Sequence, residues 1–384
     1  MGTSALADVP KGVTILSKKP SISSSFRTSF PFLSSIVLAI YPVYTDIYIY
    51  LIVVTGMMIK TVDIRNRLRD IEEYLRENYR EGKEDKKRDW RTYEQNLMNR
   101  IKVAVKSLEP LVDKATSFEI HKERGARKKL SLKQRVIILL LKEMFGKSNR
   151  MMASMLAIFS LLSGIDVSYK TIERLYSDTE VEMAIYNLHI LILKKKRIRE
   201  VDTSGDGTGY SITIKKHYAS EAQKRKEKAK KSSGKDFVYS FKLMDLKSKM
   251  YIAYGTSLKS EKVAFERAME MLEKIDMNIR SVRLDRYYSF SSYVVRFGDA
   301  KVYIIPRKNA TIKGSWKWKE TMEDFVKNTV PYLEQYYLRN NSESGFSADK
   351  RWFGWKVGQK REDRIETALS CINVWHNLLN LGQA

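Results

Sequence analysis

Four residues near the end of the chain carry side chains that could act together at one site. They are a phenol, a guanidinium, a carboxylate and an ammonium: Tyr336, Arg339, Glu343 and Lys350. At about 100° per helical residue, their spacing places them at roughly 0°, 300°, 340° and 320° around a helix axis. A solvated helix has no reason to align these four groups on one narrow face. A site that holds a metal ion beside a DNA phosphate does.

The same stretch also has the composition of a loop. Between these residues lie five weak helix formers: Asn340, Asn341, Ser342, Ser344 and Gly345. Clusters of this kind usually mark loops. On composition alone a loop is favoured, and a broken helix would place Lys350 in a separate turn. The helical alignment therefore needs support from the rest of the chain.

A strand end supplies one possible partner for Glu343. A short strand is expected over residues 281–285, with Val282 and Leu284 on its core face and Asp285 closing it before a helix. A side chain at this position projects beyond the last hydrogen bond of the sheet. The alternative for Asp285 taken alone is a helix cap.

The first expected strand, residues 199–206, supplies two more carboxylates. Asp202 and Asp206 share one face of it because side chains alternate along a strand. Asp206 opens the sequence Asp-Gly-Thr-Gly-Tyr, whose glycines permit a tight turn and an unobstructed approach of a metal ion. We favour Asp206 over Asp202 and keep both as candidates, since Asp202 could be only a turn residue.

Three carboxylates from two strands and a later helix can hold two magnesium ions about 3.5–4 Å apart, the arrangement used for in-line phosphoryl transfer. One ion would activate the attacking water or 3′-hydroxyl, and the other would stabilise the leaving oxygen. Oxygen ligands with retained waters are what Mg²⁺ prefers. Mg²⁺ is therefore the expected cofactor, and Mn²⁺ could replace it.

The charge of the chain indicates a polyanionic partner. Its 384 residues carry a formal net charge of +25, which favours binding to phosphates through counterion release. Nucleic acid and an anionic membrane surface both qualify. The 22 tyrosines and 6 tryptophans favour nucleic acid, because they can stack on bases and contact phosphates.

The cysteine and histidine content argues against a zinc site. Cys371 is the only cysteine, so an intrachain disulfide and a cysteine-rich zinc module are excluded, and its apolar neighbours predict a buried thiol. The four histidines show no metal-ligand spacing: His121, His189, His217 and His376. Zinc is not expected.

The N-terminal part of the chain reads as helical from residue 61 to residue 195. Helices are expected over 61–79, 90–114, 131–145 and 149–162, followed by a glycine-containing connection and a short helix over 169–176 that Ser168 caps. Two helices, a tight turn and a third helix match a helix-turn-helix DNA-binding region. A plain helical bundle fits almost as well. The groove-facing candidates are Tyr169, Lys170, Glu173 and Arg174.

Residues 196–384 read as strands followed by strands that alternate with helices. Strands are expected over 199–206, 210–217, 237–243, 250–256, 281–285 and 301–306. Helices are expected over 260–275 and 289–297, from residue 321 onward, and over 361–381. This order predicts an α+β fold with a mixed sheet flanked by helices. The basic run over 224–231 could follow a phosphate backbone, although such runs are usually only solvated.

The first 60 residues do not read as part of this fold. Residues 1–30 are serine-rich and basic and are expected to be disordered, whereas residues 32–59 are strongly apolar. Pro42 and Asp46 interrupt the apolar stretch, where a charge costs about 2.5–3.5 kcal/mol on insertion. Three interpretations of this stretch remain: a membrane segment, a buried hairpin, or sequence translated ahead of a start at Met57 or Met58. We favour the last.

Taken in order, these motifs resemble those of the DDE transposases of bacterial and archaeal insertion sequences. The resemblance rests on Asp-Gly-Thr-Gly-Tyr from Asp206, on Asp285 three residues before Tyr288, and on the Tyr-Arg-Glu-Lys spacing from Tyr336. It covers roughly residues 198–380. It implies an RNase H-like catalytic domain that cuts the element's ends and joins them to target DNA, within a homodimeric complex in the cytoplasm near the nucleoid.

The resemblance also implies roles for single residues. Asp206 or Asp202, Asp285 and Glu343 would hold the metal ions. Arg339 and Lys350 would contact phosphates at the element's end, Tyr336 would help to place them, and Tyr288 matches the tyrosine of the second motif. Trp316 and Trp318 could stack on bases at the cleaved end or be core residues. The competing functions are a non-catalytic helix-turn-helix DNA-binding protein, an RNase H-like repair nuclease and, least favoured, a membrane-anchored protein.

Overall fold

The computed structural model describes residues 59–78, 89–118, 128–212, 237–275 and 277–382. The segment 1–58 and the basic run 224–231 lie outside the described residues, so the expectations for them stay untested. Among the described residues, no helix combines the length and the apolar character needed to cross a membrane.

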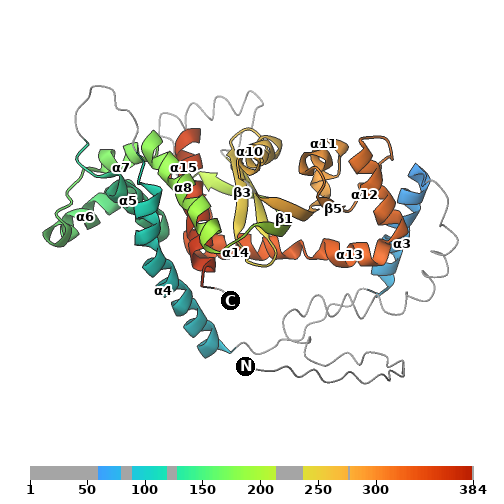
Figure 1. The fold of residues 1–384 in the computed structure, drawn as a ribbon, viewed down its shortest axis with the longest axis horizontal. Helices are drawn as coiled ribbons and strands as arrows, with labels where there is room; N and C mark the ends of the chain where they lie inside the picture. Colours follow the sequence, from blue (N-terminus) through green and yellow to red (C-terminus); the bar gives the residue numbers. More distant parts are fainter. Residues whose placement is uncertain (1–58, 79–88, 119–127, 213–236, 276, 383–384) are drawn as a thin grey trace, which may run out of the picture.

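A six-stranded mixed sheet forms the centre of the molecule, with the strand order β3-β2-β1-β4-β5 (Figure 1). The strands are β1 (Glu200–Ile212), β2 (Phe237–Asp245), β3 (Tyr251–Ser257), β4 (Asn278–Leu284) and β5 (Lys301–Ile304). β2 runs antiparallel to β1 and β3, whereas β4 and β5 run parallel to β1. The short β6 (Lys356–Val357) pairs with the far end of β1. The predicted α+β class and mixed sheet are confirmed.

The first part of the sheet differs from the prediction in one respect. In place of the two strands expected over 199–206 and 210–217 with a turn between them, residues 200–212 form one strand, since every residue from Thr203 to Ser211 pairs with β2. Residues 213–217 lie outside the described residues. The glycines of this stretch do not form a turn; they let neighbouring side chains lie close to the backbone of the strand. A Cβ atom on Gly209 would lie 1.7 Å from the ring of Phe237. Asp206 therefore lies inside β1 and not at its end.

Helices cover both faces of the sheet. α10 (Glu261–Glu273) packs on β2 and β3, while α12 (Trp316–Lys327) and α13 (Thr329–Tyr337) pack on β5. α14 (Asn340–Phe353) crosses β1, and the two helices α13 and α14 run along one side of the sheet in Figure 1. Asp285 is followed by short helical turns: η3 (Arg286–Tyr288), α11 (Ser291–Val294) and η4 (Val295–Phe297).

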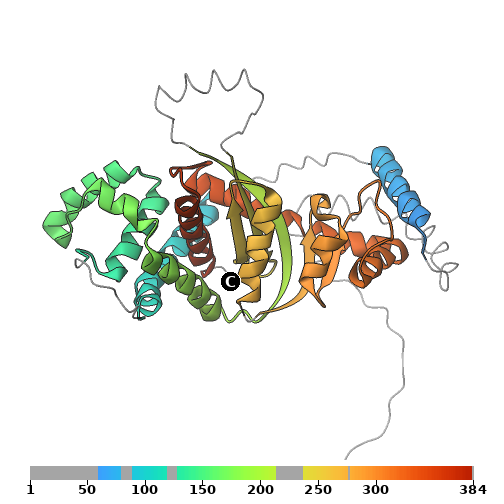
Figure 2. The ribbon, with the colours of Figure 1, turned by 90° about the horizontal axis from the view of Figure 1, so that it is seen from above.

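The N-terminal helices lie at two ends of the molecule. They are α3 (Thr61–Asn78), α4 (Trp90–Ala115), α5 (Leu132–Phe145), α6 (Asn149–Ser163), α7 (Tyr169–Leu175) and α8 (Thr179–Lys195). α3 packs on α12, while α4, α5 and α8 pack on the C-terminal helix α15 (Glu362–Asn380), as Figure 2 shows from above. The division into a helical region over 61–195 and a catalytic region over 196–384 stays a prediction. The two parts share hydrophobic cores.

A buried polar network joins α14 to the sheet and to α15. Lys242 of β2 is 0% exposed and lies 2.7 Å from Oδ2 of Asp349. The phenol of Tyr251 also donates to Asp349 Oδ2, and His376 of α15 places Nδ1 2.6 Å from Asp349 Oδ1. Burial raises the pKa of Asp349, but Lys242 and His376 outweigh it and hold this pKa below its ordinary value. One carboxylate therefore ties three elements together.

Removing this carboxylate should destabilise the fold severely. We expect Asp349→Leu to lower the free energy of unfolding by about 3–5 kcal/mol, because Lys242 is left buried and unpaired. Adding Lys242→Met should recover part of the loss, since the unpaired charge is then gone. Urea unfolding of the two variants and the wild type measures both effects. Strictly additive losses would contradict the ion pair.

The buried His189 should make stability depend on pH. Its Nε2 donates to the carbonyl of Ile252 at 2.9 Å, and burial lowers its pKa to about 4. The unfolded chain has an ordinary histidine pKa near 6.5 and binds the proton first, so this contribution is lost as pH falls from about 6.5 to 4. Between pH 7 and 4, the wild type should lose about 3 kcal/mol more stability than His189→Gln. Equal pH profiles of the unfolding free energy would refute this.

Candidate active site

The stretch from Tyr336 to Lys350 is neither a loop nor one continuous helix. α13 ends at Tyr337 and α14 begins at Asn340. Leu338 and Arg339 between them keep right-handed helical dihedral angles, but the backbone hydrogen bonds there span three residues instead of four. The weak helix formers allow a close approach to the sheet. Ser342 is fully buried, with its hydroxyl 3.0 Å from that of Ser204, and a Cβ atom on Gly345 would lie 3.1 Å from Met244 Sδ. Packing against β1 and β2, more than helix propensity, stabilises α14.

Arg339, in the turn between α13 and α14, lies among three carboxylates. Its Nη1 lies 2.7 Å from Asp206 Oδ2, and its Nη2 lies 2.9 Å from Glu343 Oε1 and 3.8 Å from Asp285 Oδ1. The side chains of Arg339 and Asp206 are 14% and 15% exposed, whereas that of Glu343 is 56% exposed. One guanidinium therefore joins a strand, the turn after a second strand and a helix.

The electrostatics of this cluster follow from burial and from its surplus of negative charge. The pKa of Asp206 is raised to about 7, mainly by burial. Asp285 and Glu343 add to this rise, and Arg339 opposes it. Burial likewise raises the pKa of Tyr336 to about 12, so its phenol stays neutral beside Arg339. Three carboxylates face a single cation, which leaves room for further positive charge.

The donor set fits a hard divalent cation. The three carboxylates offer only oxygen ligands, and two of them stay partly accessible to solvent. In the part of the chain that the structure describes, no three histidine, cysteine, aspartate or glutamate side chains already form a metal site. Arg339, which bonds to both Asp206 and Glu343, would have to yield to a metal ion. Its Nε is buried without a hydrogen-bond partner, so its present contacts are incomplete.

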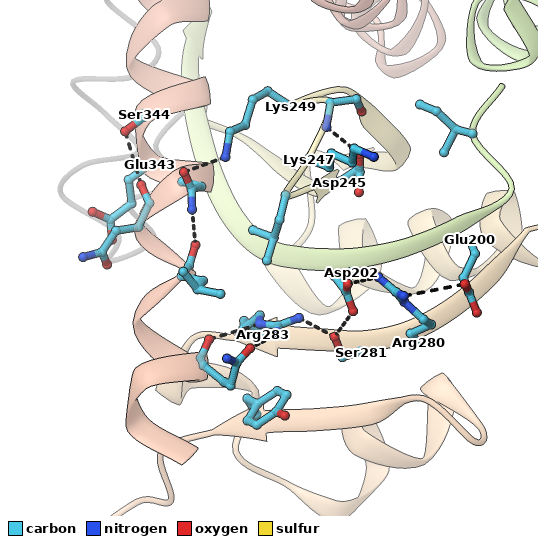
Figure 3. A pocket seen from close by; sticks show the side chains of 18 of the residues that line it. Glu200, Asp202, Asp245, Lys247, Lys249, Arg280, Ser281, Arg283, Glu343 and Ser344 are labelled. Carbon is cyan, nitrogen blue, oxygen red and sulfur yellow. Dashed lines mark hydrogen bonds and ion pairs between the residues drawn. The ribbon is translucent and has the colours of Figure 1, made fainter. Parts of the chain in front are cut away.

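Asp202, the other candidate for the first ligand, lies apart from this cluster. It accepts hydrogen bonds from Arg280 and from the hydroxyl of Ser281, on the floor of a separate trough (Figure 3). No ion pair in the described part of the chain links Asp202 to Arg339. The geometry therefore groups Asp206, and not Asp202, with Asp285 and Glu343.

The predicted DNA-contacting residues divide into two groups. Trp316 is 81% exposed, and Lys170 and Arg174 are exposed on α7, so their contacts with DNA stay predictions. Trp318 is 3% exposed and donates from Nε1 to the carbonyl of Thr311, so it is a core residue. The stacking role proposed for Trp318 is excluded because neighbouring side chains cover the ring.

Tyr288 and Lys350 also differ from the expected roles. Tyr288 is fully buried and hydrogen-bonded to Glu261, so direct contact with DNA is excluded. Lys350 does not contact the carboxylates; its ammonium lies over the rings of Trp355 at 4.4 Å and Tyr210 at 5.8 Å. Lys350 lies two helical turns beyond Glu343 on α14, so it shares that face of the helix but lies too far along it to join the carboxylates.

Comparison with known proteins identifies the family. The chain is 44% identical over 281 residues to a probable transposase for insertion sequence element ISA1214 from Archaeoglobus fulgidus, a match that covers 72% of this chain and 84% of that protein. The chain belongs to the insertion-sequence transposases. No protein-family model and no solved structure matches it. Family membership confirms the predicted insertion-sequence assignment, while the roles of single residues stay predictions.

This insertion-sequence transposase has one acidic residue beside the cluster that the sequence analysis missed. Glu261, in the first turn of α10, accepts a hydrogen bond from the phenol of Tyr288. Its Oε1 occupies the space that a side chain at position 207 would take, 2.2 Å from a Cβ built on Gly207. Gly207 directly follows Asp206 and donates its N–H to Asp206 Oδ1 at 2.8 Å. An acidic residue in a first helical turn is common, so the sequence carried no specific signal.

The contact of Glu261 with Gly207 should be measurable in the stability of the transposase. We expect Gly207→Ala to displace the Glu261 carboxylate and leave the buried Tyr288 hydroxyl unpaired, at a cost of about 1–3 kcal/mol. In a Glu261→Ala background, the same substitution should cost less, because the clash is gone. Urea unfolding of the two single variants and the double variant tests this. Additive losses would show that the three groups do not act together.

Proposed function

We propose that the protein is a DNA transposase that cuts the ends of its insertion sequence and joins them to target DNA by metal-dependent phosphoryl transfer. The observation that carries this proposal is the contact of Arg339 with Asp206, Asp285 and Glu343. The relative, which is named a probable transposase of an insertion sequence element, supports it. The mixed sheet with these carboxylates on and beside its central strand is compatible with an RNase H-like catalytic domain.

In this proposal Asp206, Asp285 and Glu343 hold Mg²⁺, which Mn²⁺ can replace. When bound, the metal would supply Lewis-acid stabilisation of the charge that develops on the attacking and leaving oxygens. Asp206 comes from the central strand β1, where it pairs with Lys242 of β2 one residue beyond the last pair with β4. Glu343 lies on α14, which Lys242 and Asp349 fasten to the sheet. Asp206 and Glu343 are thereby held on rigid elements.

Arg339 has a second part in the proposed reaction. Its fork of N–H donors matches the oxygens of a phosphate as well as those of a carboxylate. Once the carboxylates hold metal, Arg339 can donate to the phosphate at the cleavage point. The neutral phenol of Tyr336, buried beside Arg339, keeps the guanidinium at the site. The same residue thus balances charge before substrate binding and orients the substrate afterwards.

The remaining contacts with DNA are assigned to surfaces outside the cluster. Lys170 and Arg174 of α7, together with the predicted helix-turn-helix region, would bind the element's end, and the exposed Trp316 would stack on a base. The net charge of +25 favours DNA binding throughout. A homodimeric complex in the cytoplasm, at the nucleoid, would bring two ends together.

Substituting the three carboxylates should separate cleavage from DNA binding. Asp206→Asn, Asp285→Asn and Glu343→Gln should each lower Mg²⁺-dependent cleavage of an end-bearing duplex by at least about 10³-fold, because each removes a charge worth several kcal/mol in the transition state. DNA binding, measured by fluorescence anisotropy, should change little. Asp202→Asn is the matched control and should keep most of the activity.

Other outcomes of this assay would point to other functions. Cleavage that persists in all three variants would disprove the proposed triad. Binding without any cleavage by the wild type would indicate a non-catalytic DNA-binding protein. Cleavage without joining of the freed 3′-end to a second duplex would indicate a nuclease instead of a transposase.

A further inference from the structure

A wide trough contains Asp202 on its lining. Its volume is about 1570 Å³. It lies over the first halves of β1 and β4, between the turn that joins β2 to β3 and the helices α13 and α14 (Figure 3). No part of the proposed triad except Glu343 lines it. It is therefore a separate feature that adjoins the candidate active site.

The trough is strongly cationic. Nine of its lining residues are lysine or arginine and four are aspartate or glutamate, a surplus of five positive charges. A concave surface of one sign concentrates the opposite charge, because its low-dielectric walls focus the field. A small anion would need few of these cations. A surplus of this size, spread over several elements, instead suits a polyanion.

The cations on the floor already have partners. Arg280 pairs with Asp202, and Arg283 donates to Gln335 Oε1 at 2.7 Å while its guanidinium lies over the ring of Tyr303 (Figure 3). These contacts fix the shape of the floor. Asp202 balances the charge of Arg280, and the guanidinium of Arg283 is buried, so neither is readily available to a ligand.

The cations on the rim differ from those on the floor. Four of them are exposed and have no ion pair with any described carboxylate: Arg197, Arg199, Lys247 and Arg351. They come from three separate parts of the chain, namely the segment before β1, the β2–β3 turn and α14. Their convergence on one hollow is a product of the fold. Exposed cations without partners are the groups that release counterions when they meet phosphates.

The position of Glu343 connects the trough to the proposed reaction. Glu343 lines the trough and contacts Arg339, which contacts Asp206. DNA whose scissile phosphate lies at Arg339 would thus continue along the trough on the Glu343 side. We propose that the trough binds the phosphate backbone of the DNA next to the bond that is cut, with Arg199, Lys247 and Arg351 as its main phosphate contacts. This inference rests on the proposed function and adds the path of the DNA.

The salt dependence of DNA binding tests the proposal without any cleavage. The assay measures the affinity of the full chain for an end-bearing duplex in EDTA, over a range of NaCl concentrations. The slope of log K against log[NaCl] is negative, and each lost phosphate contact makes it less steep by about 1. Arg199→Ala with Lys247→Ala should therefore make it less steep by about 2. The matched control, Lys274→Ala with Lys327→Ala, removes the same charge from other elements and should leave the slope unchanged. Equal changes in both variants would overturn the proposal.

Cross-linking locates the DNA directly. The chain has one cysteine, the buried Cys371, so a cysteine introduced at Lys247 is the reactive thiol. With a duplex that carries a disulfide-activated tether on the phosphate beside the cleavage point, Lys247→Cys should cross-link at least tenfold more than Lys274→Cys. Equal yields from the two positions would refute the assignment.

The choice of DNA in the same experiment identifies which DNA occupies the trough. Cross-linking only to the end-bearing duplex assigns the trough to the element's end. Equal cross-linking to a duplex of unrelated sequence assigns it to target DNA, and a preference for a tethered single strand assigns it to the displaced strand. All three support backbone binding in the trough. Because no metal or turnover is needed, a wild type that fails to cleave would refute the proposed function and leave this test intact.

Discussion

The buried ion pair between Lys242 and Asp349 is the interaction on which the rest of the site depends. It lies between the sheet and α14, and it reaches α15 through His376. A buried charge pair is costly to desolvate and is stable only when its remaining donors and acceptors are satisfied. Tyr251 supplies a further donor, so the position of α14 on the sheet is sharply defined. Glu343 and Arg339 take their positions from that helix.

The cluster around Arg339, which α14 helps to position, contains more acidic than basic groups. Asp206, Asp285 and Glu343 surround Arg339, and burial keeps the pKa of Asp206 near 7. Strained or highly charged arrangements persist where function needs them and the surrounding fold holds them in place. The adjoining trough has the opposite imbalance, with exposed cations on its rim. The two features together form an acidic centre beside a cationic path, which is the arrangement expected for phosphoryl transfer on a polyanion.

Much of the fold could be predicted because local patterns and the tertiary structure agree. The helix expected over 131–145 and the cap expected at Ser168 are both confirmed. The β2, β3, β4 and β5 strands were also predictable from their apolar runs. The glycines at positions 207 and 209 predicted a turn, because glycine favours turns in general, and this prediction was wrong. Here they make room for Glu261 and Phe237, contacts that no local pattern reveals.

The sequence by itself determined the polyanionic character of the partner, the α+β class and the residue types that resemble those of transposases. These follow from composition, periodicity and spacing, which need no knowledge of distant contacts. Only the tertiary structure grouped Asp206, and not Asp202, with Asp285 and Glu343, and it placed the ammonium of Lys350 over Trp355 and Tyr210 instead of beside the carboxylates. The first outcome depends on strand pairing in β1, and the second on the packing of Lys350 against Trp355 and Tyr210. Such features arise from packing between residues that lie far apart along the chain.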